Sequence, residues 1–201
     1  MQQIAKHGLS LDTVNEQMRD FKRGFDYADI VTPLTIGDGI IQMDDHTRTQ
    51  GISLYDKYRS NHKIMKFVPA SGAATRMFRD LYAFLDSGTS NATVDMVVNQ
   101  IDRMAFYPDL KPFIPDNPTS RDIVSAIINP NGLNYGHMPK AFIKFHASPN
   151  GGVTPLGEHL AEGAQYATSH DNQVHIHFTL SPEHKSGFDA LLAKIVNNYA
   201  A

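Results

Sequence analysis

The chain has 201 residues, of which 41% are hydrophobic and 19% are charged, a composition that is ordinary for a globular protein. The formal net charge is −3 at pH 7, so bulk charge indicates neither nucleic acid nor an anionic membrane as a partner. Cysteine is absent, which excludes disulfides, thiolate metal sites and cysteine nucleophiles. The N-terminus has no apolar signal core and no run of membrane-spanning length, so we expect a cytoplasmic protein.

Residues 1–62 are expected to form a helical extension at the N-terminus. The segment 10–23 has the apolar period of a helix, and one of its faces carries Leu11, Val14, Met18 and Phe21. The stretch TPLTIGDGII then breaks the pattern with proline and two glycines. Residues 52–60 favour a second, short helix.

After residue 62 the expected strands and helices alternate, which is typical of α/β proteins. We predict that residues 63–201 form the first part of a mostly parallel, Rossmann-like three-layer sheet with helices on both faces, incomplete in this chain. The expected parallel strands are 64–69, 141–146 and 173–180. The expected helices are 75–86, 155–167 and 188–199.

A helical insertion is predicted at about 88–130. Apolar residues recur at helical spacing from Val94 onward, and a second helix is expected to begin at Thr119. The pattern Thr-x-x-Asp, which ends at Asp122, resembles a capping box. A proline-rich linker, 107–118, separates the two helices.

The stretch KFVPASGAATRMFRDL, residues 66–81, passes from a strand through small residues toward a helix. Unpaired amides at a helix N-terminus attract anions, and small side chains let a phosphate approach the backbone. Arg76 adds a forked, permanently charged donor. The alternative is an ordinary strand-to-helix connection with a surface arginine. The candidate phosphate-binding residues are Ser71, Gly72, Ala73, Ala74, Thr75 and Arg76.

Two further clusters are candidates for chemistry. His175 and His177 alternate along a strand and share one face, so they could bind a metal or simply form a polar face. Glu158 and Glu162 lie four residues apart on one helix, which suits acid–base or magnesium chemistry as well as a solvated face. His146 and His184 are free candidates to complete a metal site. Substrate-side candidates are Glu158, Ser181 and His184.

Three motifs in order resemble the sugar nucleotidyltransferases, whereas the Walker and dinucleotide glycine motifs are absent. These motifs are PASGAATRMF, MPKAFIKF and TPLGEHL. The resemblance implies that Gly72 and its neighbours cradle a nucleotide triphosphate and that Arg76 contacts its β- and γ-phosphates. It further implies that Lys140 lies at the α-phosphate and the incoming sugar phosphate. The implied reaction releases pyrophosphate with Mg²⁺ as cofactor, and Arg76 and Lys140 are its catalytic candidates.

The chain departs from that family in three places. Ala74 replaces a glycine of the loop, a long segment separates Arg76 from Pro139, and no residue matches the aspartate that binds magnesium. The metal ligands are therefore unknown.

The segments FVPASGAATRMF, GLNYGHMPKAFIKFH and IHFTLSPEH also resemble a bacterial domain family of unknown function. Two functions follow from these resemblances. The first is a nucleotidyltransferase-like protein, part of a longer enzyme, that binds nucleotide triphosphate and sugar phosphate. The alternative is a non-catalytic module that binds a nucleotide or a sugar phosphate.

Overall fold

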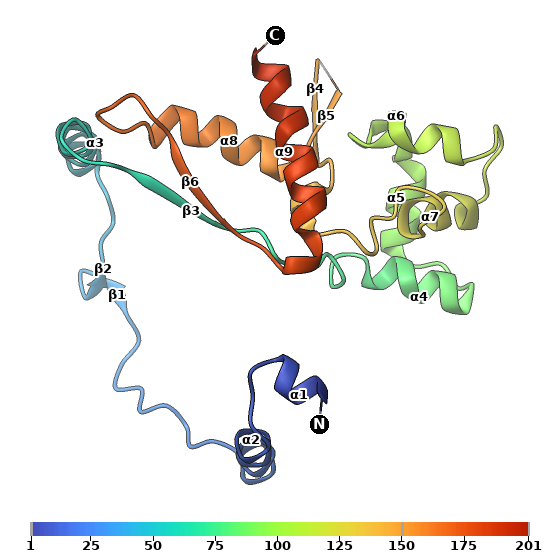
Figure 1. Ribbon diagram of the computed structural model, residues 1–201, viewed down its shortest axis with the longest axis horizontal. Helices are drawn as coiled ribbons and strands as arrows, with labels where there is room; N and C mark the ends of the chain where they lie inside the picture. The colour runs from blue at the N-terminus through green and yellow to red at the C-terminus, as the bar shows by residue number, and fades with distance from the viewer. Residues whose placement is uncertain (1, 150, 201) are drawn as a thin grey trace. The chain divides into compact units, whose positions relative to one another are not determined.

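The computed structural model describes residues 2–149 and 151–200 (Figure 1). By its internal contacts the chain divides into two units, Met1–Gly51 and Ile52–Ala201, and each is described by itself. The predicted domain boundary after residue 62 stays a prediction. The first unit contains α1 (Gln2–Lys6), α2 (Leu11–Arg23), β1 (Thr35–Ile36), β2 (Gly39–Ile40) and the first half of α3 (Asp45–Arg59).

The helix predicted at 10–23 is confirmed as α2. Its N-cap is Ser10, whose hydroxyl accepts a hydrogen bond from the amide of Thr13 at 3.0 Å. The helix predicted at 52–60 begins earlier than expected, because α3 starts at Asp45. The pairing of β1 with β2 was not predicted.

The second unit carries the longer elements. Its strands are β3 (Met65–Pro69), β4 (His146–Ser148), β5 (Gly151–Val153) and β6 (His175–Thr179). Its α-helices after α3 are α4 (Arg79–Ser87), α5 (Ala92–Asn99), α6 (Tyr107–Leu110), α7 (Ser120–Ile128), α8 (Pro155–Tyr166) and α9 (Lys185–Ala200). Its 3-10 helices are Ile101–Arg103, Lys111–Phe113, Lys140–Phe142 and Pro182–His184.

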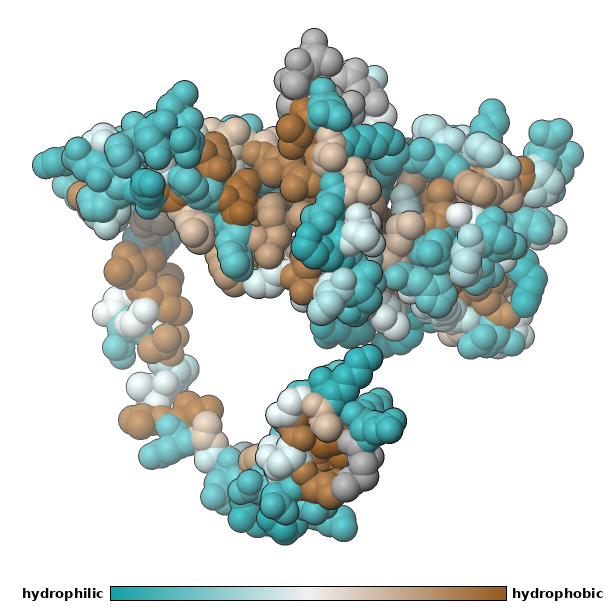
Figure 2. Space-filling view, viewed as in Figure 1, coloured by the Kyte–Doolittle hydropathy of each residue, from teal (hydrophilic) through white to brown (hydrophobic). Residues whose placement is uncertain are grey.

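Two predicted strands, 64–69 and 173–180, are confirmed as the parallel pair β3–β6. Alternation along β6 places Ile176 and Phe178 on the covered face, where the Cδ1 atom of Ile176 approaches Gly163 of α8. The opposite face carries Met65 and Phe67, which are 65% and 62% exposed. Apolar side chains are accordingly visible around this pair in Figure 2. One face of the sheet therefore packs on α8 and the other is open within the second unit.

The strand predicted at 141–146 is wrong. Residues Lys140–Phe142 form a 3-10 helix, and β4 pairs antiparallel with β5 in a separate sheet. The alternation that mimics a strand has another cause: Ala141 is buried in one apolar cluster of the unit and Ile143 in the other. The alternate residues of this segment are therefore buried in two different apolar clusters and not on one face of a sheet.

The predicted single, mostly parallel sheet with helices on both faces is therefore not confirmed. In the described part of the chain, β3–β6 is a two-stranded sheet, and so are β1–β2 and β4–β5. The prediction of a mixed α/β protein is confirmed, because the second unit contains both helices and strands, and β3 and β6 are parallel.

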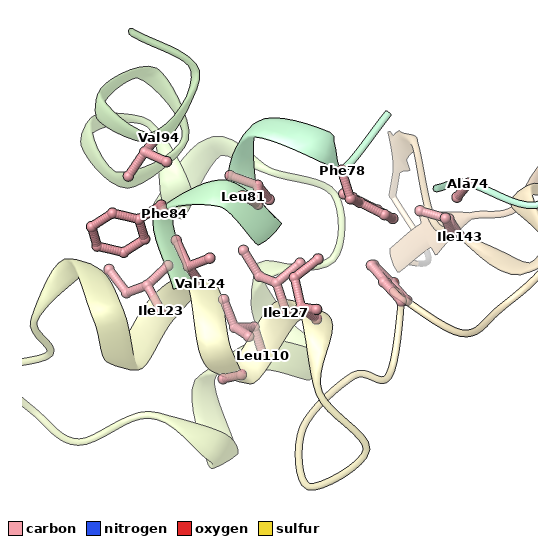
Figure 3. Packing of buried hydrophobic residues seen from close by; sticks show 13 residues of the cluster. Ala74, Phe78, Leu81, Phe84, Val94, Leu110, Ile123, Val124, Ile127 and Ile143 are labelled. Atoms are coloured by element: carbon pink, nitrogen blue, oxygen red, sulfur yellow. The ribbon is translucent and has the colours of Figure 1, made fainter. Parts of the chain in front are cut away.

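The segment predicted as a helical insertion is helical and contains the larger core. The capping box is confirmed: Thr119 accepts from the amide of Asp122, whose carboxylate accepts from the amide of Thr119 at 2.9 Å. The expected linker 107–118 contains α6 and a 3-10 helix instead of an open loop. Figure 3 shows how α4, α5, α6 and α7 contribute to this core. Its fully buried residues include Val94, Leu110, Val124, Ile127, Ile128 and Ile143.

Replacing Gly132 by Ala should destabilise the protein. A Cβ atom at this position would lie 2.0 Å from the carbonyl oxygen of Ala126, so the backbone must shift, at a cost of about 1–3 kcal/mol. The matched control is Gly72→Ala, because a Cβ at Gly72 meets nothing within 4 Å. Chemical denaturation of both variants checks this, and equal stability of the two would contradict the packing described for Gly132.

Candidate functional site

The loop of residues 71–76 follows the carboxyl end of β3, where ligands bind in open α/β sheets. Its position is fixed by a hydrogen bond from the amide of Lys140 to the carbonyl oxygen of Gly72, 3.0 Å long. An isolated antiparallel bridge between Ala73 and Pro139 extends this contact. Two segments that are far apart in the sequence, one holding the glycine and the other the lysine, are thus joined by their backbones.

The helix after this loop begins later than predicted. Residues 74–78 form a turn in which the amides of Met77 and Phe78 donate to the carbonyl of Ala74, and α4 starts at Arg79. Arg76 therefore lies in the turn before the helix and not in its first turn. Gly88 follows α4 with φ of 75°, a left-handed conformation that favours glycine at the end of a helix.

The loop and the turn after it contain backbone amides that could bind an anion, although the N-terminus of α4 lies further along the chain. Among residues 2–149 and 151–200, no acceptor is found for the amides of Gly72, Thr75 and Arg76. Gly72 has open space where a side chain would lie. An anion can therefore approach this backbone closely, as the small residues of the loop predict.

A first cavity of about 340 Å³ opens beside this loop. Its walls come from the end of β3, from β6, from the start of α8 and from the 3-10 helix at Lys140. Most of its lining is apolar, and the polar groups are the backbone of Gly72 and the side chains of Lys140 and His159. The lining residues are Val68, Pro69, Ala70, Gly72, Lys140, Ala141, Pro155, Leu156, His159 and Phe178.

A second cavity of about 350 Å³ shares one wall with the first, formed by Lys140, Pro155 and His159. Its own lining consists of Met77, Phe145, His146, Val153 and Glu158. Lys140 therefore borders both cavities and is the cation common to them.

Lys140 has no counter-charge in the described part of the chain. Its Nζ atom lies 5.9 Å from the centre of the Phe145 ring, and no carboxylate is within ion-pair distance. Three other lysines of this unit are paired: Lys66 with Glu162 and Lys144 with Asp109, each at 2.6 Å, and Lys185 with Asp189. A lysine without a partner beside two cavities suits an anionic ligand.

Glu158 and Glu162, predicted to share a face, have different partners. Glu158 accepts from Nδ1 of His146 at 2.9 Å beside the second cavity. Glu162 is bound by the ammonium group of Lys66, which also donates to the carbonyl of His159 at 3.1 Å. Glu158 thus lines the second cavity, whereas Glu162 connects α8 to β3 through its ion pair with Lys66.

The Lys66–Glu162 pair is an ion pair between β3 and α8. The side chain of Lys66 is only 8% exposed. Burial alone lowers the pKa of Lys66, but its hydrogen bonds to Glu162 and Tyr166 outweigh burial and leave the pKa raised. The same hydrogen bond and charge hold the pKa of Glu162 below its usual value of 4.5.

The other predicted site residues lie apart from the cavities. Ser181 and His184 bound a 3-10 helix after β6 and line neither cavity, and Arg76 is exposed near Met77. His177 stacks on Phe67, which favours the polar-face interpretation of the histidine pair. Whether the side chains of Arg76 and Lys140 converge on one ligand stays a prediction.

Among residues 2–149 and 151–200, no group of three or more His, Asp or Glu side chains is arranged so that it could hold a metal ion. In the same residues, no helix is long and apolar enough to cross a membrane.

Sequence reasoning missed His159 and Phe145 as lining residues. His159 occupies the second turn of α8, next to Glu158, and its position after TPLG was the available signal. Phe145 falls within the strand expected at 141–146, so the sequence pattern did not predict its place in a cavity wall.

Glu162→Gln should make the free energy of unfolding depend less on pH in acid. Because the pKa of Glu162 is lowered by folding, its contribution is present above about pH 4.5 and is lost as pH falls through the lower, folded-state value. The wild type should therefore lose more stability than the variant between about pH 6 and pH 3. Denaturant titrations across this range measure the difference, with Glu183→Gln as control. Parallel profiles of wild type and Glu162→Gln would contradict the account.

The chain was compared with known proteins. A family model described as "Domain of unknown function (DUF4301)" matches residues 1–201. No curated protein and no solved structure matches the chain. Because the match spans the whole chain, the protein belongs to the family of the domain of unknown function DUF4301.

Proposed function

We propose that this protein binds a nucleotide triphosphate or a sugar phosphate at the loop 71–76 and Lys140. The observation that carries the proposal is the hydrogen bond between Lys140 and Gly72, which brings an unpaired lysine to a glycine loop beside a cavity. Backbone amides and a fixed positive charge are the groups that bind phosphate in proteins.

The charges of the loop and of Lys140 support an anionic ligand. Lys140 lacks a carboxylate partner, and Arg76 forms no ion pair with any residue that the structure describes. Glu162, which lies 3.4 Å from His159 on the same helix, forms an ion pair with Lys66. Two free cations around the loop match a ligand with more than one phosphate.

A nucleotidyltransferase reaction is the second function that we propose. It is supported by the order of the three motifs and by the place of Lys140 beside Gly72. The described residues do not fit a magnesium ion held by the protein, since they offer no cluster of carboxylates. We therefore assign no step to such an ion and expect this chain alone to bind its ligand weakly, with little or no turnover.

Gly72→Val should weaken triphosphate binding without unfolding the protein. The added side chain points into open space, so it clashes only with a phosphate that approaches the loop. We expect at least about a tenfold loss of affinity for ATP by calorimetry, with a smaller loss in Gly72→Ala. Unchanged affinity in a folded Gly72→Val protein would rule out the loop as the phosphate site.

Arg76→Ala should cost about 1.5–3 kcal/mol of binding free energy if Arg76 donates a charge-assisted hydrogen bond to the ligand. Arg79→Ala is the matched control, because Arg79 is an exposed arginine that pairs with Asp80. Calorimetric titrations with several nucleotides and sugar phosphates test both variants. The role of Arg76 would be refuted by equal affinity in Arg76→Ala and wild type. Rapid pyrophosphate release by this chain would refute the expectation of little turnover.

A further inference from the structure

We propose that the second cavity is a separate subsite for an organic anion that has an aromatic or apolar body. The inference goes beyond phosphate binding at the loop, because the apolar wall formed by Met77, Phe145 and Val153 is not shared with the first cavity, although Lys140 borders both. Its volume of about 350 Å³ falls in the range of small-molecule pockets, roughly 300–1,000 Å³.

The walls of this cavity are divided between apolar and charged groups. Met77, Phe145, Val153 and Pro155 form the apolar part, and they come from the turn before α4, from the segment before β4, from β5 and from the start of α8. The polar groups are Lys140, His146, Glu158 and His159. A ligand that suits such a site buries an apolar body and directs one charged group to the polar side.

The sign of that charged group is inferred from the partners of the polar lining residues. Glu158, the carboxylate of the lining, already has a hydrogen-bond partner in Nδ1 of His146 at 2.9 Å. His159 lies 3.4 Å from Glu162, which is also bound to Lys66. Lys140 is left as the cation without a counter-charge among the described residues. The ligand is therefore an anion.

The position of Phe145 indicates that the apolar part of the ligand is an aromatic ring. This ring is 38% exposed, and the Nζ atom of Lys140 lies 5.9 Å from its centre. A phosphate or carboxylate bound by Lys140 would hold an attached ring close to Phe145, where stacking and apolar burial both favour it. Aromatic phosphates and carboxylates are thus the class of ligand that the cavity fits.

Titration of the 201-residue protein with phenyl phosphate, inorganic phosphate and phenol tests the proposal. Phenyl phosphate should bind at least about tenfold more tightly than inorganic phosphate, because only it uses both the cation and the apolar wall. Phenol should bind more weakly than phenyl phosphate. Equal affinity for phenyl phosphate and inorganic phosphate, or no binding of either, would overturn the subsite.

Variants locate the site. In Phe145→Ala the advantage of phenyl phosphate over inorganic phosphate should vanish; Phe145→Leu should reduce it and serves if the alanine variant does not fold. Phe113→Ala is the matched control, because Phe113 is an exposed ring of the helical region. An undiminished advantage in either folded Phe145 variant would overturn the assignment of the ring.

The two sites fail separately. Gly72→Val should lose ATP affinity and keep the preference for phenyl phosphate, whereas Phe145→Ala should keep ATP affinity and lose that preference. Loss of the preference in Gly72→Val would place phenyl phosphate in the first cavity and overturn the separate subsite. If Gly72→Val loses only ATP binding, the result supports the phosphate loop and leaves the separate subsite in place.

Discussion

The hydrogen bond from the amide of Lys140 to the carbonyl of Gly72 is the contact on which the candidate site depends. It joins the loop after β3 to the segment that precedes β4, and these two parts of the chain are separated by the whole helical region. Without it, Lys140 would have no defined position beside the glycine loop and between the two cavities. Backbone contacts hold this geometry, so it does not depend on flexible side chains.

The short segment that carries Lys140 also connects the two apolar clusters of the second unit. Ala141 lies in the cluster formed with α8 and α9, and Ile143 in the helical cluster with Leu110 and Ile127. Burial of alternate residues in two cores fixes the backbone between them. The site therefore lies where two separately packed regions meet, which is a common position for ligand sites.

Local signals in the sequence were sufficient for elements that depend on their own residues. Ser10, Thr119 and Gly88 mark helix ends, and the alternation of His175–Thr179 marks a strand. The strand expected at 141–146 is wrong because alternation of apolar residues indicates which residues are buried but not which element buries them. The start of α4 was misplaced because the turn at Ala74 satisfies the same amides. The pairing of Glu158 with His146 depends on tertiary contact, which no spacing in the sequence reveals.

The central claim is that the Gly72 loop and Lys140 bind one phosphorylated ligand. Amide chemical shifts of the isotope-labelled protein, followed during titration with ATP, test it most directly. The account predicts that the largest shifts occur together at Gly72, Thr75, Arg76 and Lys140, with one common dissociation constant, and that the amides of α5 and α7 stay unchanged. Shifts confined to other parts of the chain, or different dissociation constants for Gly72 and Lys140, would contradict it.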